Sequence, residues 1–223
     1  MPPVPDHPLF AAAYDHLLAL SEARGLADRR RHLLSRARGR VLEIGAGTGL
    51  NLAYYPPDAV TSVVALEPDG AMRRRLQGRI TAGGSPVPCQ VVDAEVGRAS
   101  FPEHSFDTVV CTLVLCAVAD PVATVAAIRT WLAPDGCLLF LEHVRAGGLA
   151  GRLQRVAGPL WQWGAAGCHL DRDTLAVLRG ADLAVTDCQR FALPAGGVLL
   201  SACVQGVARP RPLIAAGAGG AGS

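Results

Sequence analysis

Three glycines at alternating positions, Gly45, Gly47 and Gly49, directly follow a short apolar run at 41–44. The run predicts a buried strand, and glycine is needed where backbone turns sharply or approaches a ligand closely. A strand, a glycine turn and a helix N-terminus together form a cradle for nucleotide-like ligands. The dinucleotide fingerprint is not matched, because the third glycine comes one residue early and Leu50 holds the last position. The spacing favours a nucleoside ligand without a pyrophosphate; an ordinary tight turn is the alternative.

A carboxylate, Glu67, follows the next apolar run at 60–66. It lies about 20 residues beyond the glycines, where nucleotide-binding α/β domains place an acid against ribose hydroxyls. An acid at the end of a strand is otherwise a turn residue or a helix cap. Its distance from this particular loop favours ribose binding.

Strand and helix patterns alternate along the chain and predict the sheet that positions these residues. The predicted strands are 41–44, 60–66, 90–92, 108–114 and 137–141. The predicted helices are 51–55, 71–80 and 121–131, and two more precede the glycines, one ending at Gly25 and one at 27–34. Near the C-terminus we expect a helix at 172–178 capped by Asp171, and two antiparallel strands at 183–191 and 198–204. The expected fold is a Rossmann-like doubly wound α/β sheet, mostly parallel, with an antiparallel C-terminal strand and helices on both faces.

Three regions divide the 223 residues. Residues 1–39 are expected to form an N-terminal helical cap, 40–205 the main domain and 206–223 a disordered tail of Arg, Pro, Gly and Ala. The cap is rich in arginine, including Arg29, Arg30 and Arg31, and we interpret this run as a solvated helix face. A net charge of +2 gives no reason to expect nucleic acid as a partner.

Seven scattered cysteines, without a C-x-x-C pair, predict reduced thiols in the cytoplasm. No metal is expected, because Cys168 and His169 are adjacent but no second pair has finger spacing. Cys111 and Cys116 are expected to pack as small buried hydrophobic residues. No signal peptide and no apolar run of membrane-spanning length is visible, so stable membrane insertion is not expected. The sequence leaves the oligomeric state open.

The loop at 42–49, Leu-Glu-Ile-Gly-Ala-Gly-Thr-Gly, resembles motif I of class I S-adenosylmethionine-dependent methyltransferases. The segments 93–95, 101–107 and 132–136 resemble later motifs of that superfamily, and the resemblance spans roughly residues 40–204. Three stretches are similar to the alkyl-thiol methyltransferases and their bacterial relatives: Val-Cys-Thr-Leu-Val-Leu-Cys at 110–116, Glu-His-Val at 142–144, and Gly-Cys-His-Leu-Asp-Arg-Asp-Thr at 167–174.

The resemblance implies a set of residues that bind S-adenosylmethionine. They are Glu43, Gly45, Gly47 and Gly49 for its amino-acid portion, Glu67 for the ribose, Asp93 and Ala94 for the adenine, and Thr112 and Leu113 near the methyl donor. The sequence departs from the family pattern at Val92, where a glycine often precedes the acid. It also lacks the hydrophobic N-terminal anchor of the animal thiol methyltransferases.

Methyl transfer to a small-molecule acceptor, with a thiol favoured, is the function that this resemblance implies. A thiol reacts as its thiolate, so a nearby base or positive charge would help. His143, at the end of the fifth strand, and His169 are the candidates, and a purely structural role is the alternative for each. Other possibilities are O-, N- or C-methylation of a hydrophobic metabolite such as a quinone or lipid precursor, or a non-catalytic cofactor-binding regulator. A nicotinamide dehydrogenase is disfavoured by the glycine spacing.

Overall fold

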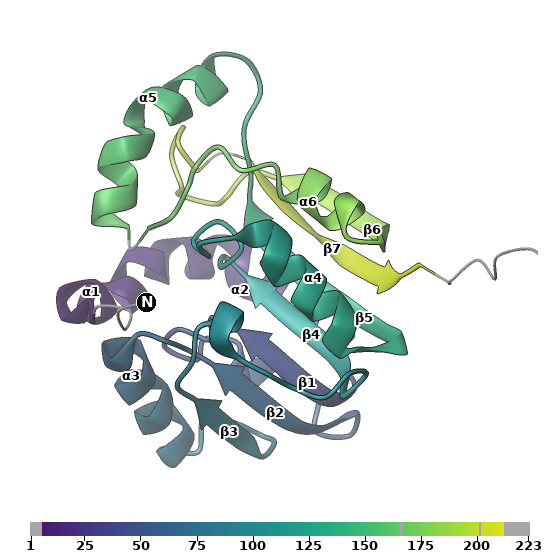
Figure 1. The fold of residues 1–223 in the computed structure, drawn as a ribbon. Coiled ribbons are helices and arrows are strands. Elements are labelled where there is room, and N and C mark those ends of the chain that lie inside the picture. The colour runs from purple at the N-terminus through teal and green to yellow at the C-terminus, as the bar shows by residue number, and fades with distance from the viewer. Residues whose placement is uncertain (1–5, 166, 201, 212–223) are drawn as a thin grey trace, which may run out of the picture.

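A computed structural model of the chain describes residues 6–165, 167–200 and 202–211. Figure 1 shows a central sheet covered by helices on both faces. The strands are β1 (Gly39–Ile44), β2 (Val60–Leu66), β3 (Cys89–Val92), β4 (Phe106–Thr112), β5 (Leu132–His143), β6 (Leu183–Phe191) and β7 (Cys203–Pro210). The helices are α1 (Pro8–Ser21), α2 (Ala27–Leu34), α3 (Gly70–Thr81), α4 (Pro121–Trp131), α5 (Gly148–Gly164) and α6 (Thr174–Gly180).

The seven strands lie in the order β3-β2-β1-β4-β5-β7-β6. The first five of these strands run parallel to one another, and β7 runs antiparallel to both β5 and β6. The order reverses between β1 and β4, and ligands of open α/β sheets bind at the carboxyl ends of the strands at such a reversal. This topology confirms the doubly wound sheet that the sequence predicts.

Each face of the sheet has its own apolar core because the strands are apolar on both sides. Leu33 and Leu34 of α2 and Leu76 of α3 belong to the core on one face. Ile128 of α4 and Leu178 of α6 belong to the core on the other. Helix α1 packs against α3, so it lies over the carboxyl edge of the sheet rather than on either face.

Most predicted elements are confirmed within a few residues, but the structure differs from the expectations in four places, one of which is a helix that the sequence did not predict. Residues 51–55 form a single 3-10 turn, Leu52–Tyr54, because Pro56 and Pro57 stop any longer helix. Helix α6 is capped by Asp173, which accepts from the Ala176 N–H, and not by Asp171. Residues 148–164 form the continuous helix α5 despite the internal Pro159.

The fourth correction concerns the C-terminus. Strand β7 begins at Cys203 and runs to Pro210, so residues 206–210 belong to the sheet and not to a disordered tail. A Cβ at Gly206 would lie 2.1 Å from the Asp187 carbonyl oxygen and 2.7 Å from the Phe140 ring, so tight packing explains this glycine. The rest of the predicted tail, residues 212–223, lies outside the described residues. The predicted boundary after residue 205 therefore falls inside β7, and the division near residue 39 stays a prediction.

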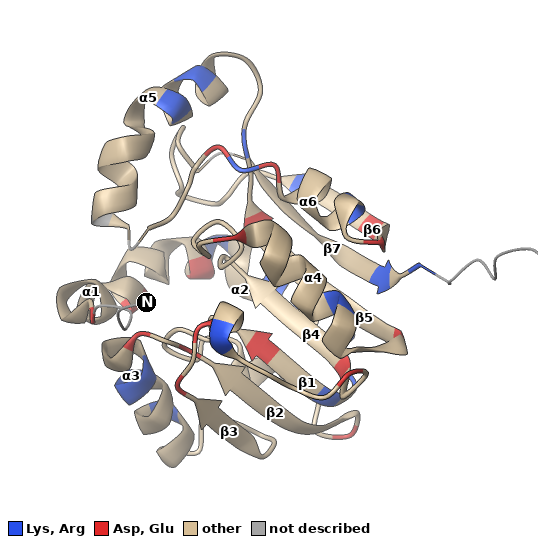
Figure 2. Cartoon of the chain, in the orientation of Figure 1, with Lys and Arg blue, Asp and Glu red and all other residues tan. Residues whose placement is uncertain are grey.

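Charged residues of both signs are spread over several elements (Figure 2). Among the helices that the structure describes, none is both long and apolar enough to cross a bilayer.

Candidate active site

The glycine loop after β1 adopts backbone angles that other residues rarely take. The φ angle is +63° at Gly45, +59° at Gly47 and +84° at Gly49. A Cβ at Gly45 would lie 2.2 Å from the Val114 side chain, whereas a Cβ at Gly47 would meet nothing within 4 Å. Gly45 is therefore required for packing, and Gly47 leaves the loop open to a ligand.

A cavity of about 20 Å³ lies against the loop. Its walls are Tyr14, Arg30, Gly45, Ala46, Gly47, Thr48, Leu50, Asn51 and Thr112. This volume is enough for one water molecule and too small for a nucleoside.

Helix α1 closes the cavity and is tied to the loop by hydrogen bonds. Thr48 Oγ1 donates to Asp15 Oδ1 over 2.6 Å, and Arg79 of α3 donates to Asp15 Oδ2 over 2.8 Å. The backbone N–H of His7, just before α1, donates to Asp69 at the start of α3. Helix α1 therefore covers the part of the loop against which the cavity lies.

Glu67 lies at the end of β2 and reaches the loop. Its Oε2 accepts the Gly47 N–H over 2.7 Å, and its Oε1 accepts the Asp69 N–H over 2.9 Å. Burial raises the pKa of this carboxyl group more than these two hydrogen bonds lower it. A carboxylate accepts about four hydrogen bonds, so Glu67 keeps the capacity to bind ribose hydroxyls.

Glu43, at the carboxyl end of β1, is held by protein groups on both oxygens. Asn51 Nδ2 donates to Oε1 over 2.8 Å, and the Tyr55 hydroxyl donates to Oε2 over 2.7 Å. Burial raises the pKa of Glu43, and the hydrogen bonds from Tyr55 and Asn51 oppose that shift. Through these two hydrogen bonds Glu43 fixes the segment that follows the glycines. Its contact with the cofactor stays a prediction.

Arg30 corrects the interpretation of the N-terminal arginines as a solvated face. Its side chain is buried, and its guanidinium donates to Glu22, to Asn51 Oδ1 and to Thr112 Oγ1. This network joins α2, the loop segment and the end of β4, and it places a positive charge in the cavity wall.

Asp93 and Ala94, the predicted adenine contacts, follow β3. Asp93 forms an ion pair of 2.6 Å with Arg73 of α3. Ala94 is partly buried against the core on the α4 face. Arg73 also donates to the backbone oxygens of Glu67 and Pro68, so it links the end of β2 to the end of β3.

The ends of β4 and β5 meet beside the glycine loop. Leu113, directly after Thr112, has a positive φ of +56°, and its N–H donates to the Leu141 carbonyl. Glu142 of β5 accepts the N–H groups of Val114 and Leu115 on one oxygen. Burial raises the pKa of Glu142 to about 7 against the effect of those two hydrogen bonds.

Two cysteines and a histidine meet at the same edge. His143 Nε2 lies 2.8 Å from Cys168 Sγ, and Cys168 Sγ lies 3.7 Å from Cys116 Sγ. The hydrogen bond between Cys116 and Cys168, together with His143, lowers the pKa of Cys168 to about 4 against the effect of burial. Burial alone would lower the pKa of His143, but the hydrogen bond and negative charge of Cys168 raise it. The two pKa shifts run in the directions that favour transfer of the Cys168 proton to His143.

His169, the other predicted base, lies outside this group. Its Nδ1 is paired with Gln162 Nε2 over 2.9 Å, and its backbone N–H donates to the Cys116 carbonyl. Cys116 is buried, as expected, but it is not only a packing residue because it contacts Cys168. Sequence spacing gave no sign of this cluster, since its members come from three distant segments.

Comparisons with known proteins decide the family. Residues 17–186 match the family model described as a methyltransferase domain.

The chain belongs to the methyltransferase domain family.

Among curated proteins, this methyltransferase is 31% identical to the human thiol S-methyltransferase TMT1B, over 82% of this chain and 80% of the relative. It is 30% identical to the human thiol S-methyltransferase TMT1A, over 75% of this chain and 69% of the relative. The protein is therefore an S-adenosylmethionine-dependent methyltransferase, as the resemblance implies.

Solved structures share the fold of this methyltransferase. An S-adenosylmethionine-dependent methyltransferase from Mesorhizobium loti has a TM-score of 0.63 at 20% identity, and covers 85% of this chain and 97% of its own. The [4+2]-cyclase SpnF has a TM-score of 0.69 at 14% identity, over 95% of this chain and 100% of its own.

Proposed function

We propose that this methyltransferase methylates the sulfur of a small-molecule thiol. The observation that carries the proposal is the similarity to thiol S-methyltransferases over most of both chains. The three stretches that resemble that group are also the ones that supply Cys116, His143 and Cys168.

The cofactor side of the site is proposed to follow the glycine loop. Gly45, Gly47 and Gly49 would hold the amino-acid portion together with Glu43, and Glu67 would bind the ribose. Asp93 and Ala94 would contact the adenine, and Thr112 and Leu113 would lie near the methyl donor. When bound, S-adenosylmethionine would supply an activated methyl group on a sulfonium centre, with neutral S-adenosylhomocysteine as the leaving group.

The acceptor side is proposed to lie at the ends of β4 and β5. A basic or positively charged group there favours the thiolate form of an acceptor. We assign this role to His143 because its ring lies in the cysteine cluster. We do not assign it to His169, whose Nδ1 is paired with Gln162. The protein's remaining contribution is alignment of the two reactants and exclusion of water.

A second candidate is N-methylation of a lipid precursor. One relative, the phosphatidylethanolamine N-methyltransferase of Cereibacter sphaeroides, is 28% identical over 47% of this chain and 51% of its own. That similarity covers less of both proteins than the similarity to the thiol enzymes does, so the thiol remains the favoured acceptor.

Turnover tests the proposal directly. Purified protein with S-adenosylmethionine is offered alkyl thiols, phenols, amines, quinols and phosphatidylethanolamine, and formation of S-adenosylhomocysteine is measured. We expect release with thiols, and a His143→Gln variant should lose turnover while it keeps its cofactor affinity. Formation of S-adenosylhomocysteine with amines or with the lipid alone would support the second candidate. If the protein binds the cofactor but forms no S-adenosylhomocysteine with any acceptor class, a non-catalytic regulator is favoured.

A reducing compartment such as the cytoplasm is part of the proposal. All seven cysteines are free, and disulfides are rare in reducing compartments.

A further inference from the structure

Three soft ligand atoms converge at the ends of β4 and β5. The Sγ atoms of Cys116 and Cys168 and a ring nitrogen of His143 all lie within 4.8 Å of one another. Cys116 follows β4, His143 ends β5, and Cys168 lies between α5 and α6. Distant segments are thus folded so that two thiols and one imidazole share a small buried volume.

The spacing of these atoms suits a tetrahedral zinc ion. With Zn–S bonds of about 2.3 Å, two thiolate ligands stand about 3.8 Å apart, and a thiolate and an imidazole nitrogen about 3.5 Å. The two sulfur atoms lie 3.7 Å apart. His143 Nε2 lies 2.8 Å from Cys168 Sγ, so the ring must withdraw by somewhat less than 1 Å.

We propose that Cys116, His143 and Cys168 bind a zinc ion whose fourth position takes the sulfur of the acceptor thiol. Three protein ligands with one open position are typical of catalytic zinc sites, and a Cys₂His set is one of the known combinations. Zinc with two thiolates and a neutral imidazole carries no net charge. It binds the acceptor sulfur as a thiolate, and the thiol proton leaves to solvent. With zinc bound, the metal supplies the positive charge that favours the thiolate, and His143 acts by holding the metal and not as a free base.

The site lies on the side of the sheet edge where the acceptor is needed. Cys116 Sγ donates to the Leu113 carbonyl over 3.6 Å, and Val114, between these two residues, contacts Gly45 of the glycine loop. The role of the fourth position rests on the proposed thiol activity; binding of the metal itself does not.

Metal content of the full-length protein tests the site without any assay of activity. After loading with zinc and dialysis against metal-free buffer, we expect one zinc per chain by mass spectrometry. Cys168→Ser and His143→Gln should retain less than a tenth of that amount, whereas Cys188→Ser, at an exposed cysteine, should retain all of it. Circular dichroism establishes that each variant is folded.

Cobalt provides an independent signal, because Co²⁺ bound by thiolates gives a charge-transfer absorption that must disappear in Cys116→Ser and Cys168→Ser. Loss of zinc from the wild type on dialysis, or equal retention by all variants, would overturn the site. So would a wild type that forms a Cys116–Cys168 disulfide instead of binding metal.

Full thiol turnover by metal-free protein would overturn the role of the fourth position and leave the proposed function standing. Zinc binding with turnover of amines only would contradict the thiol function and keep the metal site.

A different observation concerns helix α5, which buries a polar residue and two glycines and exposes large apolar side chains. Gln154 is buried, accepts the Ala146 N–H over 2.7 Å and donates to the Leu199 carbonyl over 2.9 Å. Gly151 and Gly158 lie on the same buried side. The opposite side exposes a stripe of large apolar side chains, between 43% and 87% accessible: Leu149, Leu153, Val156, Leu160 and Trp163.

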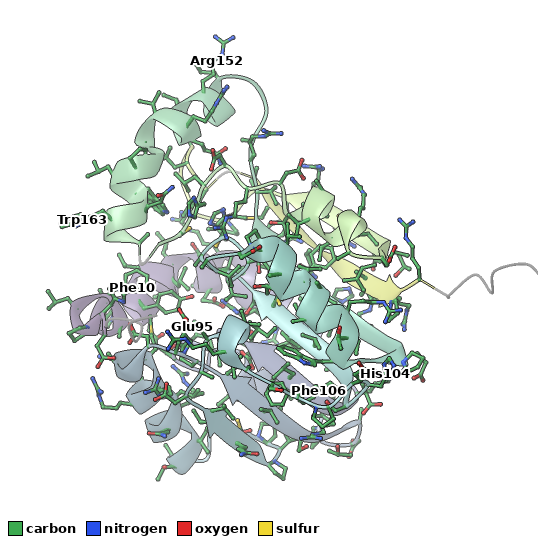
Figure 3. All side chains as sticks on the ribbon, in the orientation of Figure 1. Phe10, Glu95, His104, Phe106, Arg152 and Trp163 are labelled. Atoms are coloured by element: carbon green, nitrogen blue, oxygen red, sulfur yellow. The ribbon has the colours of Figure 1, made fainter. Side chains whose placement is uncertain are left out.

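We infer that this stripe rests on the surface of an anionic membrane, with α5 parallel to the bilayer. Arg152 and Arg155 lie on the exposed side of α5, and residues 148–164 contain no acid. Figure 3 shows Arg152 and Trp163 pointing away from the body of the molecule, and Figure 2 shows only positive charge on α5. An apolar face with arginine and a terminal tryptophan is typical of interfacial helices.

Sedimentation with vesicles tests this inference. We expect the full chain to pellet with phosphatidylcholine vesicles that contain phosphatidylglycerol, and at least tenfold less with phosphatidylcholine alone. Leu160→Ser with Trp163→Ser should abolish pelleting, whereas Val122→Ser, at an exposed apolar residue of α4, should not change it. Equal pelleting of both variants would overturn the membrane contact. So would concentration-dependent dimers that the α5 substitutions abolish, in a protein that binds no vesicles.

Discussion

Glu67 joins the end of β2 to the glycine loop through its bond with the Gly47 N–H. Glu67→Ala removes this bond and the proposed bonds to the ribose. Hydrogen bonds to a charged group contribute about 1.5–3 kcal/mol, so cofactor affinity should fall roughly 10- to 100-fold. Titration calorimetry with S-adenosylhomocysteine measures the change. Asp187→Ala, which removes a partly exposed carboxylate paired with Arg36, is the control. Unchanged affinity in Glu67→Ala would contradict the ribose assignment.

The raised pKa of Glu43 predicts that the stability of the protein depends on pH. Its pKa is raised above 4.5 in the folded state, chiefly by burial, so the native protein binds more protons than the unfolded chain above that pH. The free energy of unfolding therefore decreases as pH rises from about 4.5 through the raised value. Glu43→Gln lacks this group, and its amide can accept from Asn51 while it donates to the Tyr55 oxygen.

Urea denaturation of both proteins at pH 5 and pH 8 measures this difference. We expect the wild type to lose stability relative to Glu43→Gln as pH rises. Titrating groups that do not interact with Glu43 are common to both proteins, so their effects cancel in the comparison. Parallel pH profiles would show that Glu43 titrates normally in the folded state.

The sequence predicted the residues whose signal is local. The glycines and Glu67 were identified because their spacing along the chain is itself the signal. Arg30 was misjudged because its partners Asn51 and Thr112 are 21 and 82 residues away. Cys116 and Cys168 were missed as a pair for the same reason, since only the folded sheet brings their segments together.

Helix α1 covers the cavity of about 20 Å³ beside the glycine loop, so we expect a ligand bound there to displace it. We expect S-adenosylhomocysteine to change the hydrogen exchange of Pro8–Ser21. Asp15→Ala removes its bonds to Thr48 and Arg79, so it should speed exchange of α1 in the free protein. Asp28→Ala, an exposed acid of α2, is the control. Identical exchange of α1 with and without cofactor would show that α1 does not gate the site.

Strand β7 depends on the absence of a side chain at Gly206. Gly206→Ala places a Cβ against the Asp187 carbonyl and the Phe140 ring, so it should destabilise the fold by about 1–3 kcal/mol, as overpacking does. Gly78→Ala is a matched control, because Gly78 lies inside α3 and its Cβ would meet nothing within 4 Å. That control should stabilise the protein by about 0.4–1 kcal/mol. Chemical denaturation measures both, and equal stability of the two variants would refute the packing argument.

Elements with strong apolar patterns were predictable, and elements set by tertiary pairing were not. The expected strands at 60–66 and 183–191 and the helix at 121–131 match β2, β6 and α4 residue for residue. Strand β7 was placed five residues too early, because pairing with β5 and β6 outweighs its Gly, Arg and Pro content. Helix α5 was missed because its apolar stripe faces outward while glycines and a proline interrupt its sequence.

Across the whole molecule, the proposed cofactor and acceptor sites lie at one edge of the sheet. The loop after β1, Glu67 after β2 and the cluster after β4 and β5 all follow carboxyl ends of parallel strands. The fold alone does not specify the reaction, since a [4+2]-cyclase has the same architecture. Specificity for the ligand therefore has to come from the loop and the side chains at this edge.

The shift in Tm on adding a ligand shows which nucleoside the protein binds, because a ligand that binds the folded state raises its stability. A ligand at 100 times its Kd stabilises the folded state by about 2.7 kcal/mol, which raises Tm by roughly 5–10 °C for a chain of this size. We expect S-adenosylhomocysteine to give such a shift and NADH to give none, because the early third glycine and Leu50 disfavour a pyrophosphate. Thermal unfolding with each ligand measures both, and Glu67→Ala should reduce the first shift. Equal stabilisation by NADH would mean that the loop accepts a pyrophosphate, and the reasoning from glycine spacing would be wrong.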